Sequence, residues 1–170
     1  LWIKPYSLDT SGSPRSPDKV LTLLDERFPL DYETCRYFTI IYGVLDTETL
    51  VLRFGRAGHT PIIAHTAGSG VEVWMDGQRP IGWPIKTQFK MYEKKLAPRT
   101  RVVVYSDGIT DAENKNLSKR FGLTRLAEVV QTGASTGIDE CADIVMKTLD
   151  EWLEGDEPDD DVTLLILETA

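Results

Sequence analysis

Two carboxylate-bearing segments carry the most suggestive chemistry of this 170-residue sequence. In the first, an apolar run ends in Tyr105-Ser106-Asp107-Gly108, so a buried strand delivers an Asp followed by a Gly that permits a sharp turn. In the second, Asp159-Asp160-Asp161 comes directly before the apolar run Val162–Ile166. Each segment also has a simpler interpretation, because Asp-Gly is an ordinary turn and an acidic run is usually a solvated loop.

Taken together, the two segments have the composition of a site for a hard divalent cation. Acids packed against the start of a buried strand repel one another and lose hydration, and a bound cation relieves that cost. Mg²⁺ and Mn²⁺ prefer oxygen ligands, and Mg²⁺ usually keeps several waters and only one or two carboxylates. Such an ion activates a water and clamps a phosphoryl oxygen, which makes phosphate chemistry the natural hypothesis.

A third segment places a histidine among small residues, in Phe54-Gly55-Arg56-Ala57-Gly58-His59-Thr60-Pro61. His59 could be a general acid or metal ligand, or a packed histidine that shapes a turn. The second interpretation is favoured, since the motif holds no other histidine, and His65 in an expected strand has a weaker claim. The planar guanidinium of Arg56 could hold a phosphate.

The elements that position these residues follow from the apolar periodicity. Helical spacing predicts three helices: 17–28 after the N-cap Ser16, 123–130 and 138–152. β-Branched and aromatic runs predict seven strands: 36–45, 50–54, 62–65, 71–75, 88–96, 101–105 and 162–167. Residues 97–100 are expected to form a turn between two of them. With most strands before two of the helices, the pattern indicates one α+β layered domain without internal repeats.

The charge of the sequence is concentrated in one place. The net charge is −8, and eight acids with no Lys or Arg lie between Asp150 and Asp161, leaving 19 acidic and 19 basic residues elsewhere. No basic stripe is available for a phosphate backbone, which argues against nucleic-acid binding. The helical acids Asp150, Glu151 and Glu154 are expected to be solvated surface.

The cysteines and the apolar runs of the sequence indicate the cellular compartment in which the protein is expected. Cys35 and Cys141 are too few for a disulfide framework and are expected to be reduced core thiols. No apolar run approaches the ~20 residues that span a membrane, so no membrane partner and a cytoplasmic location are expected. The start at Leu1 without an initiator Met indicates the C-terminal part of a longer chain.

The motifs and their order resemble the SpoIIE/RsbU-type branch of the PP2C-like (PPM) metal-dependent serine/threonine phosphatases. The matching stretches are Tyr37-Phe38-Thr39 with Tyr42-Gly43, Ala57-Gly58-His59-Thr60-Pro61, Pro80-Ile81-Gly82, Tyr105-Ser106-Asp107-Gly108-Ile109-Thr110-Asp111, Phe121-Gly122-Leu123 and Asp160-Asp161-Val162-Thr163-Leu164. The resemblance implies one PP2C-like domain over residues 1–170, with the family's β-sandwich flanked by helices on both faces.

The same resemblance implies a metal centre with two Mg²⁺ or Mn²⁺ ions in the complete domain and a metal-activated water that attacks phosphoserine or phosphothreonine. Asp107 resembles the family's metal-binding Asp that precedes a Gly, Asp160 resembles the other late ligand, and Gly108 is expected to be a cofactor-binding residue. Asp161 is expected beside the ligands, although a one-residue slip exchanges its role with that of Asp160. No catalytic residue is expected beyond the metal ligands.

Three departures from the family pattern matter. The early motifs, which supply an Asp that bridges both metals, have no match, so activity is expected to be very low if Leu1 is the true start. Arg56 stands where Asn is commoner, and Ser106 stands where Thr is commoner. Both substitutions are expected to be tolerated.

The function that the resemblance implies is the phosphatase module of a bacterial signalling protein. Its expected partner is a phosphorylated protein such as an anti-sigma-factor antagonist, with a receiver, PAS or GAF-like sensor domain upstream and a homodimer as one possible assembly. One alternative is a noncatalytic PP2C-like adaptor that binds a regulator of a sigma-factor pathway. Another is an α+β binding module whose acids are only surface.

Overall fold

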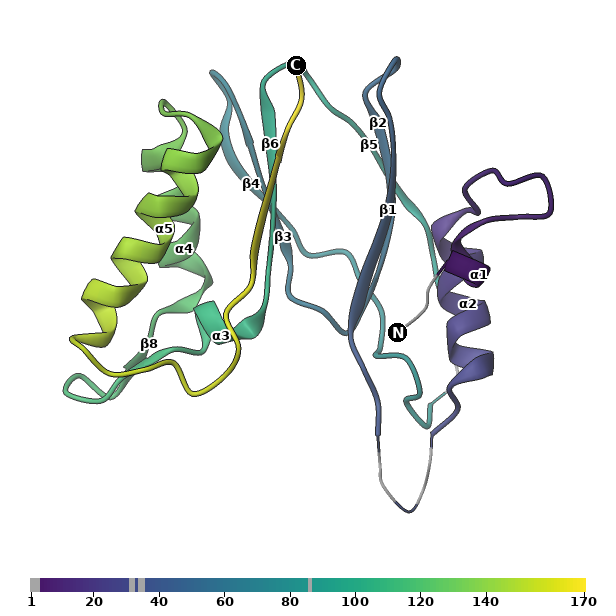
Figure 1. Ribbon diagram of the computed structural model, residues 1–170, viewed down its shortest axis with the longest axis horizontal. Coiled ribbons are helices and arrows are strands. Elements are labelled where there is room, and N and C mark those ends of the chain that lie inside the picture. Colours follow the sequence, from purple (N-terminus) through teal and green to yellow (C-terminus); the bar gives the residue numbers. More distant parts are fainter. Residues whose placement is uncertain (1–3, 31–32, 34–35, 86) are drawn as a thin grey trace. The chain divides into compact units, whose positions relative to one another are not determined.

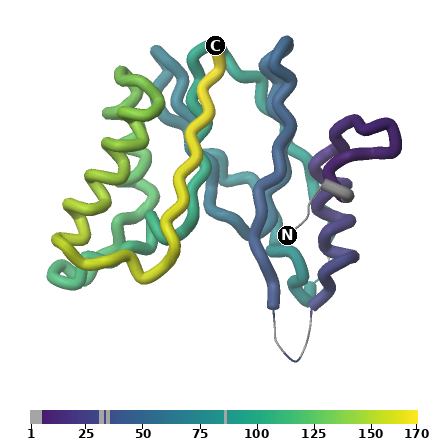
Figure 2. Tube along the Cα trace, viewed as in Figure 1, coloured from purple at the N-terminus to yellow at the C-terminus, as the bar shows by residue number. Residues whose placement is uncertain are grey.

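The computed structural model describes residues 4–30, 33, 36–85 and 87–170, and these divide into two compact units (Figure 1). The first unit comprises Leu1–His59 with Asp76–Leu96, and the second comprises Thr60–Met75 with Ala97–Ala170. The chain therefore passes from the first unit to the second, back, and to the second again, as the colours of Figure 2 show. Each unit contains its own antiparallel sheet with helices on one face.

The first unit is built on a three-stranded sheet with the order β1-β2-β5. Its elements are α1 (Lys4–Ser7), α2 (Pro17–Arg27), β1 (Ile40–Asp46), β2 (Val51–Ala57) and β5 (Tyr92–Lys95). β1 and β2 pair over their whole length, with Gly43 opposite Phe54, across the turn expected after Asp46. An isolated bridge between Phe38 and Ile81 attaches the segment after β4 to the segment before β1.

Helix α2 begins where the sequence predicts, with Ser16 as N-cap and Pro17 at its first position, although the Ser16 side chain makes no capping hydrogen bond. Its apolar stripe, Val20, Leu21 and Leu24, is fully buried against the sheet. The approach is close, because a Cβ at Gly55 of β2 would lie 2.7 Å from Leu21 Cδ1. Glycine at this strand position therefore lets the helix sit directly on the backbone of the sheet.

The second unit is built on a four-stranded antiparallel sheet with the order β4-β3-β6-β9. Its strands are β3 (Ile62–Thr66), β4 (Gly70–Trp74), β6 (Thr100–Tyr105) and β9 (Leu164–Glu168), with the small hairpin β7 (Glu113–Asn114) and β8 (Lys119–Arg120). Its helices are α3 (Asp107–Thr110), α4 (Gly122–Gly133) and α5 (Ile138–Leu153). The apolar faces of α4 and α5 pack on Ile63, Val103 and Tyr105 of the sheet.

The α+β class is confirmed, and most predicted elements are present at nearly their predicted bounds. One prediction about the region before β6 is wrong, because the strand expected over 88–96 is limited to Tyr92–Lys95. The turn expected within 97–100 is present at residues 98–99, but it leads from one sheet to the other, since β5 pairs with β2 and β6 pairs with β3 and β9. The segment therefore crosses between sheets, which local turn chemistry cannot reveal.

The structure bears on one of the two cysteines and on the question of a membrane-spanning helix. Cys141 is a buried free thiol in the core of the second unit, as predicted, whereas Cys35 lies outside the described residues. Among the described residues, no helix is both long enough and apolar enough to cross a membrane.

Candidate functional site

Asp107 stands at the end of the most deeply buried strand of the second unit. β6 ends at Tyr105, Ser106 adopts an extended conformation, and Asp107 opens the single turn α3. The turn is closed by a hydrogen bond of 2.7 Å from the Asp111 N–H to the Asp107 carbonyl. The Asp107 side chain is exposed while Gly108 behind it is buried, so the predicted Asp-Gly turn is the start of a short helix that presents the carboxylate to solvent.

Ser106 connects this strand end to the acidic segment before β9. Its Oγ donates to the Asp161 carbonyl at 2.8 Å and accepts from the Thr163 N–H at 2.8 Å. The Ser106 N–H also donates to the Thr163 carbonyl at 3.0 Å. Three hydrogen bonds thus hold the two predicted site segments side by side, although they lie more than 50 residues apart in sequence.

Gly108 is required by how closely the two segments approach. A Cβ at this position would lie 2.5 Å from the Asp161 carbonyl oxygen and 3.0 Å from that of Asp160. The space of a side chain is therefore filled by the backbone of the acidic segment. Glycine here therefore serves close packing between the two candidate metal-binding segments, a function beyond the sharp turn that the sequence indicates.

The carboxylates of Asp160 and Asp161 are exposed, like that of Asp107. One oxygen of Asp160 accepts a hydrogen bond of 2.7 Å from the Asp161 N–H, which orients that carboxylate along its own backbone. Within the described part of the chain, no three His, Cys, Asp or Glu side chains come together as a metal-binding group. The two segments are therefore adjacent, and they offer carboxylate and carbonyl oxygens, the donor type that Mg²⁺ and Mn²⁺ prefer.

The His59 segment is held mainly by interactions with backbone. Arg56 donates through Nε to the Asp76 carbonyl at 2.8 Å and through Nη1 to the His59 carbonyl, and its guanidinium covers Gly77. His59 Nδ1 lies 3.3 Å from Thr39 Oγ1. These contacts favour the interpretation of His59 as a packed histidine that shapes a turn. They also engage the Arg56 guanidinium, which would have to be available in order to hold a phosphate.

The sequence of this chain matches a known protein family over almost its whole length. Residues 7–170 match the family model described as Stage II sporulation protein E (SpoIIE). The chain belongs to the SpoIIE family. This confirms the resemblance that the motifs indicate, and the match includes both segments of the candidate site.

Solved structures share the fold of this chain, and a curated relative shares part of its sequence. The SiaA PP2C domain of Pseudomonas aeruginosa superposes with a TM-score of 0.80 at 22% identity, covering 91% of this chain and 61% of that one. The PP2C phosphatase domain of SpoIIE from Bacillus subtilis, solved with a fragment of its regulatory domain, gives 0.76 at 15% identity, covering 98% and 47%. Protein IcfG of Synechocystis is 27% identical over 130 residues, which are 76% of this chain and 20% of IcfG. The fold of this SpoIIE-family chain is therefore that of the PP2C phosphatases.

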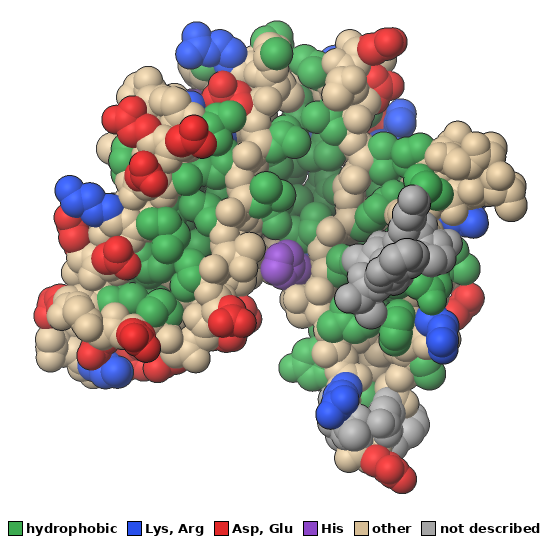
Figure 3. Space-filling view, in the orientation of Figure 1, with side chains coloured by type: hydrophobic (Ala, Val, Ile, Leu, Met, Phe, Trp, Pro, Cys, Tyr) green, Lys and Arg blue, Asp and Glu red, His purple; other side chains and the backbone are tan. Residues whose placement is uncertain are grey.

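The acidic run of this SpoIIE-family chain is more structured than the sequence suggests. Glu154, expected to be solvated surface, accepts hydrogen bonds from Asn114 Nδ2 at 3.2 Å and Asn116 Nδ2 at 2.7 Å. Asp156 lies 3.2 Å from Lys115 Nζ. The β7–β8 hairpin thereby anchors the loop that leads to Asp160. Figure 3 shows how acidic side chains gather over the helices and loops of the second unit.

Two residues that sequence reasoning missed organise the neighbourhood of the site. Asn114 is buried and also donates to the Trp152 carbonyl at 2.7 Å, so it fixes the end of α5. Thr60 donates from Oγ1 to the Tyr105 carbonyl at 2.5 Å, at the strand end that precedes Asp107. Neither has a local sequence signal, because each depends on a partner about 40 residues away.

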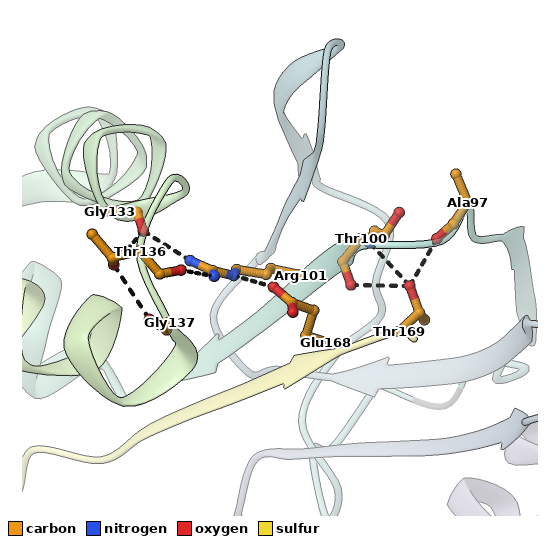
Figure 4. A network of polar contacts seen from close by, with 8 residues as sticks. All are labelled: Ala97, Thr100, Arg101, Gly133, Thr136, Gly137, Glu168 and Thr169. Atoms are coloured by element: carbon orange, nitrogen blue, oxygen red, sulfur yellow. Dashed lines mark hydrogen bonds and ion pairs between the residues drawn. The ribbon is translucent and has the colours of Figure 1, made fainter.

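At the opposite end of β6, a buried cation ties the sheet to the α4–α5 connection (Figure 4). Arg101 donates to Glu168 Oε2 at 2.6 Å, to the Gly133 carbonyl at 2.8 Å and to the Thr136 carbonyl. Burial is the largest single influence on the pKa of Arg101 and acts to lower it. The hydrogen bond and the charge of Glu168 act in the opposite direction, and the pKa is raised overall. Burial first, and the nearby Arg101 second, lower the pKa of His65, which is a buried residue of β3.

Proposed function

We propose that this chain is the catalytic part of a Mg²⁺- or Mn²⁺-dependent protein serine/threonine phosphatase of bacterial signalling. The observation that carries the proposal is the close packing of Gly108 against the Asp160–Asp161 backbone, with Ser106 hydrogen-bonded to Asp161 O and Thr163 N. It brings together the two segments that carry the family-like metal motifs. Membership of the SpoIIE family and the PP2C fold support the assignment.

The residues present fit a divalent metal. Asp107, Asp160 and Asp161 offer exposed carboxylates, and the cradle over Gly108 is closed by main-chain oxygens that a Cβ would displace. Oxygen donors of this kind suit Mg²⁺ and Mn²⁺ better than softer metals. A similar structure, the SpoIIE phosphatase domain of Bacillus subtilis, was presoaked with Mn and superposes with a TM-score of 0.63 at 17% identity. We assign Asp107 and Asp160 as ligands, with Asp161 beside them.

When bound, such ions lower the pKa of a coordinated water and neutralise charge on the phosphoryl oxygens of the substrate. The chain contributes the geometry. Ser106 keeps the Asp107 turn and the Asp160–Asp161 segment in register through its hydroxyl, and Gly108 lets the two backbones touch. As in the family, we propose that water attacks the substrate phosphate directly, so that no side chain of the chain is expected to carry a phosphoryl group.

Membership of the SpoIIE family supports a proposal for the substrate class. We propose phosphoserine or phosphothreonine on a protein partner such as an anti-sigma-factor antagonist. The chain spans 47% of the SpoIIE structure that includes a fragment of the regulatory domain, which supports a sensor or receiver domain elsewhere in the full protein. A single PP2C-like domain over residues 1–170 and a homodimer remain part of the proposal.

The test is hydrolysis of a phosphoserine peptide by the full-length protein with and without Mn²⁺. We expect metal-dependent turnover that falls at least about a hundredfold in Asp107→Asn. Loss of a metal ligand typically lowers activity more than loss of a residue that only contacts a ligand. Asp150→Asn, an exposed acid on α5, is the matched control and should retain turnover. Turnover that survives unchanged in Asp107→Asn contradicts the proposal.

A noncatalytic adaptor is the second candidate, because no three metal-ligating side chains meet within the described residues. It predicts a folded full-length protein that binds a phosphorylated partner protein without hydrolysing it at millimolar Mn²⁺. Absence of Mn²⁺ binding in calorimetry, together with absence of turnover, would favour it over the phosphatase.

A further inference from the structure

An apolar groove lies beside one edge of the four-stranded sheet. Within the described residues β4 is the terminal strand, with β3 on one side only. A terminal strand presents N–H and C=O groups that have no partner in the sheet. Helix α4 runs alongside β4, and the two enclose a groove of about 470 Å³. Its floor is lined by Val71, Val73, Leu123 and Ala127, and its rim includes Glu128.

The groove has the length of a short extended peptide. Gln131 closes one end of the groove. Its Oε1 would lie 3.2 Å from a Cβ at Gly70, and its Nε2 lies 3.4 Å from His65 Nε2. From Gln131 to Leu123 the helix covers roughly 12 Å, at the usual rise per residue. An extended chain advances about 3.3 Å per residue, so the groove holds about four residues.

The side chains around the groove differ from those of a protected edge. The edge strand β5 of the other sheet carries Lys94 and Lys95, the charged residues that commonly discourage strand addition. β4 carries one exposed charge, Glu72, and the half-buried Val71 and Val73 on either side of it pack toward α4. Glu128, the only charged residue in the groove lining, is exposed and makes no ion pair within the described part of the chain.

We propose that this groove binds an extended segment of a partner protein, which adds to β4 as a fifth strand. Aliphatic side chains at alternate positions of the segment enter the groove between Val73 and Ala127, and a Lys or Arg of the segment faces Glu128. Main-chain hydrogen bonds to the β4 edge provide affinity, and the groove with its single carboxylate selects an apolar, basic segment. The proposal concerns partner recruitment and does not depend on catalysis at Asp107.

The first experiment tests strand addition. The probe is a fluorescein-labelled octapeptide of alternating Val and Lys, titrated with the full-length protein and followed by fluorescence anisotropy. A second probe has the same sequence with N-methyl groups on alternate amides, which removes main-chain donors and keeps every side chain and charge. We expect the N-methylated probe to bind at least about tenfold more weakly, since several hydrogen bonds are lost. Equal affinity for the two probes overturns the proposal.

The second experiment tests the groove. Ala127→Phe fills its floor and should weaken binding at least about tenfold, and Glu128→Lys should weaken it about fivefold. Glu140→Lys, an exposed charge reversal on α5, is the matched control and should leave the affinity within about twofold. A probe of alternating Val and Glu should bind Glu128→Lys better than the native protein. This charge exchange keeps the test valid even if Ala127→Phe fails to fold.

The remaining measurement distinguishes other occupants. Light scattering on the native protein and on Ala127→Phe reports self-association. If the native protein forms a dimer that Ala127→Phe dissociates, the groove binds a second copy of this chain and the partner proposal is wrong. A native protein and variant of equal mass, with probe binding lost only in the variant, supports it.

Discussion

Ser106 Oγ donates a hydrogen bond of 2.8 Å to the carbonyl oxygen of Asp161. The contact joins the residue before Asp107 to the residue after Asp160, so the two segments of the candidate site are held by one small side chain. The same Oγ accepts the Thr163 N–H, which makes the hydroxyl both donor and acceptor. Ser106 therefore sets the spacing of the acidic segments while Asp107 and Asp160 carry the charge.

Removing this hydroxyl should loosen the site. Ser106→Ala leaves the Asp161 carbonyl and the Thr163 N–H without their side-chain partner, and we expect it to lower the free energy of unfolding by about 1 kcal/mol, since the region is solvent-accessible. Ser106→Thr keeps the hydroxyl and should restore the loss. Urea denaturation measures both; an alanine variant as stable as the native protein would show that the hydrogen bonds are not needed.

Adding one methyl group at Gly108 should separate the two segments. In Gly108→Ala the new Cβ meets the Asp161 carbonyl oxygen at 2.5 Å, so the acidic segment must move. We expect a loss of roughly 1–3 kcal/mol in stability and weaker Mn²⁺ binding by calorimetry. Gly43→Ala, whose Cβ would make only ordinary contacts of 3.4 Å or more, is the control. Equal effects of the two substitutions would contradict this account.

Stability should fall as the pH is lowered past the ordinary titration of histidine, because of His65. Burial first, and Arg101 second, lower the pKa of His65 in the folded state, although Glu168 acts in the opposite direction. The unfolded chain takes up the proton near pH 6.5, so the contribution of His65 to stability is constant well above that pH and decreases below it until the folded pKa is passed. Urea midpoints between pH 5 and 8 measure the slope. His65→Gln should reduce the slope, and an identical slope in both proteins would refute the assignment.

Arg101 should be far more important to stability than an exposed arginine. Arg101→Met leaves Glu168 and two main-chain carbonyls without their buried cation, at an expected cost of about 3–5 kcal/mol. Arg53→Met is the matched variant, because Arg53 pairs with Glu93 at 2.8 Å while both side chains are about half exposed. Its cost should be about 1 kcal/mol or less. Thermal unfolding of both variants tests the difference, and similar melting temperatures would show that burial of Arg101 contributes little.

The longer helices, most strands and the two acidic motifs could be predicted from the sequence alone. The stripe of Val20, Leu21 and Leu24 predicted α2, and the periodicity through Val145 and Leu149 predicted α5, because each depends on neighbours one turn away. The motifs around Asp107 and Asp160 indicated the SpoIIE family, which the family match confirms.

Which segments meet could not be predicted from the sequence, because it depends on the folded chain as a whole. The crossing of residues 97–100 between sheets, the burial of Arg101 and the hydrogen bonds of Glu154 to two asparagines involve partners 30 or more residues apart. The physical reason is that hydrogen bonding and close packing are satisfied by whichever groups folding brings within reach. Ser106 and Gly108 read locally as a turn, and their function as a hydrogen-bonding bridge and a close-packing site exists only once β9 lies beside β6.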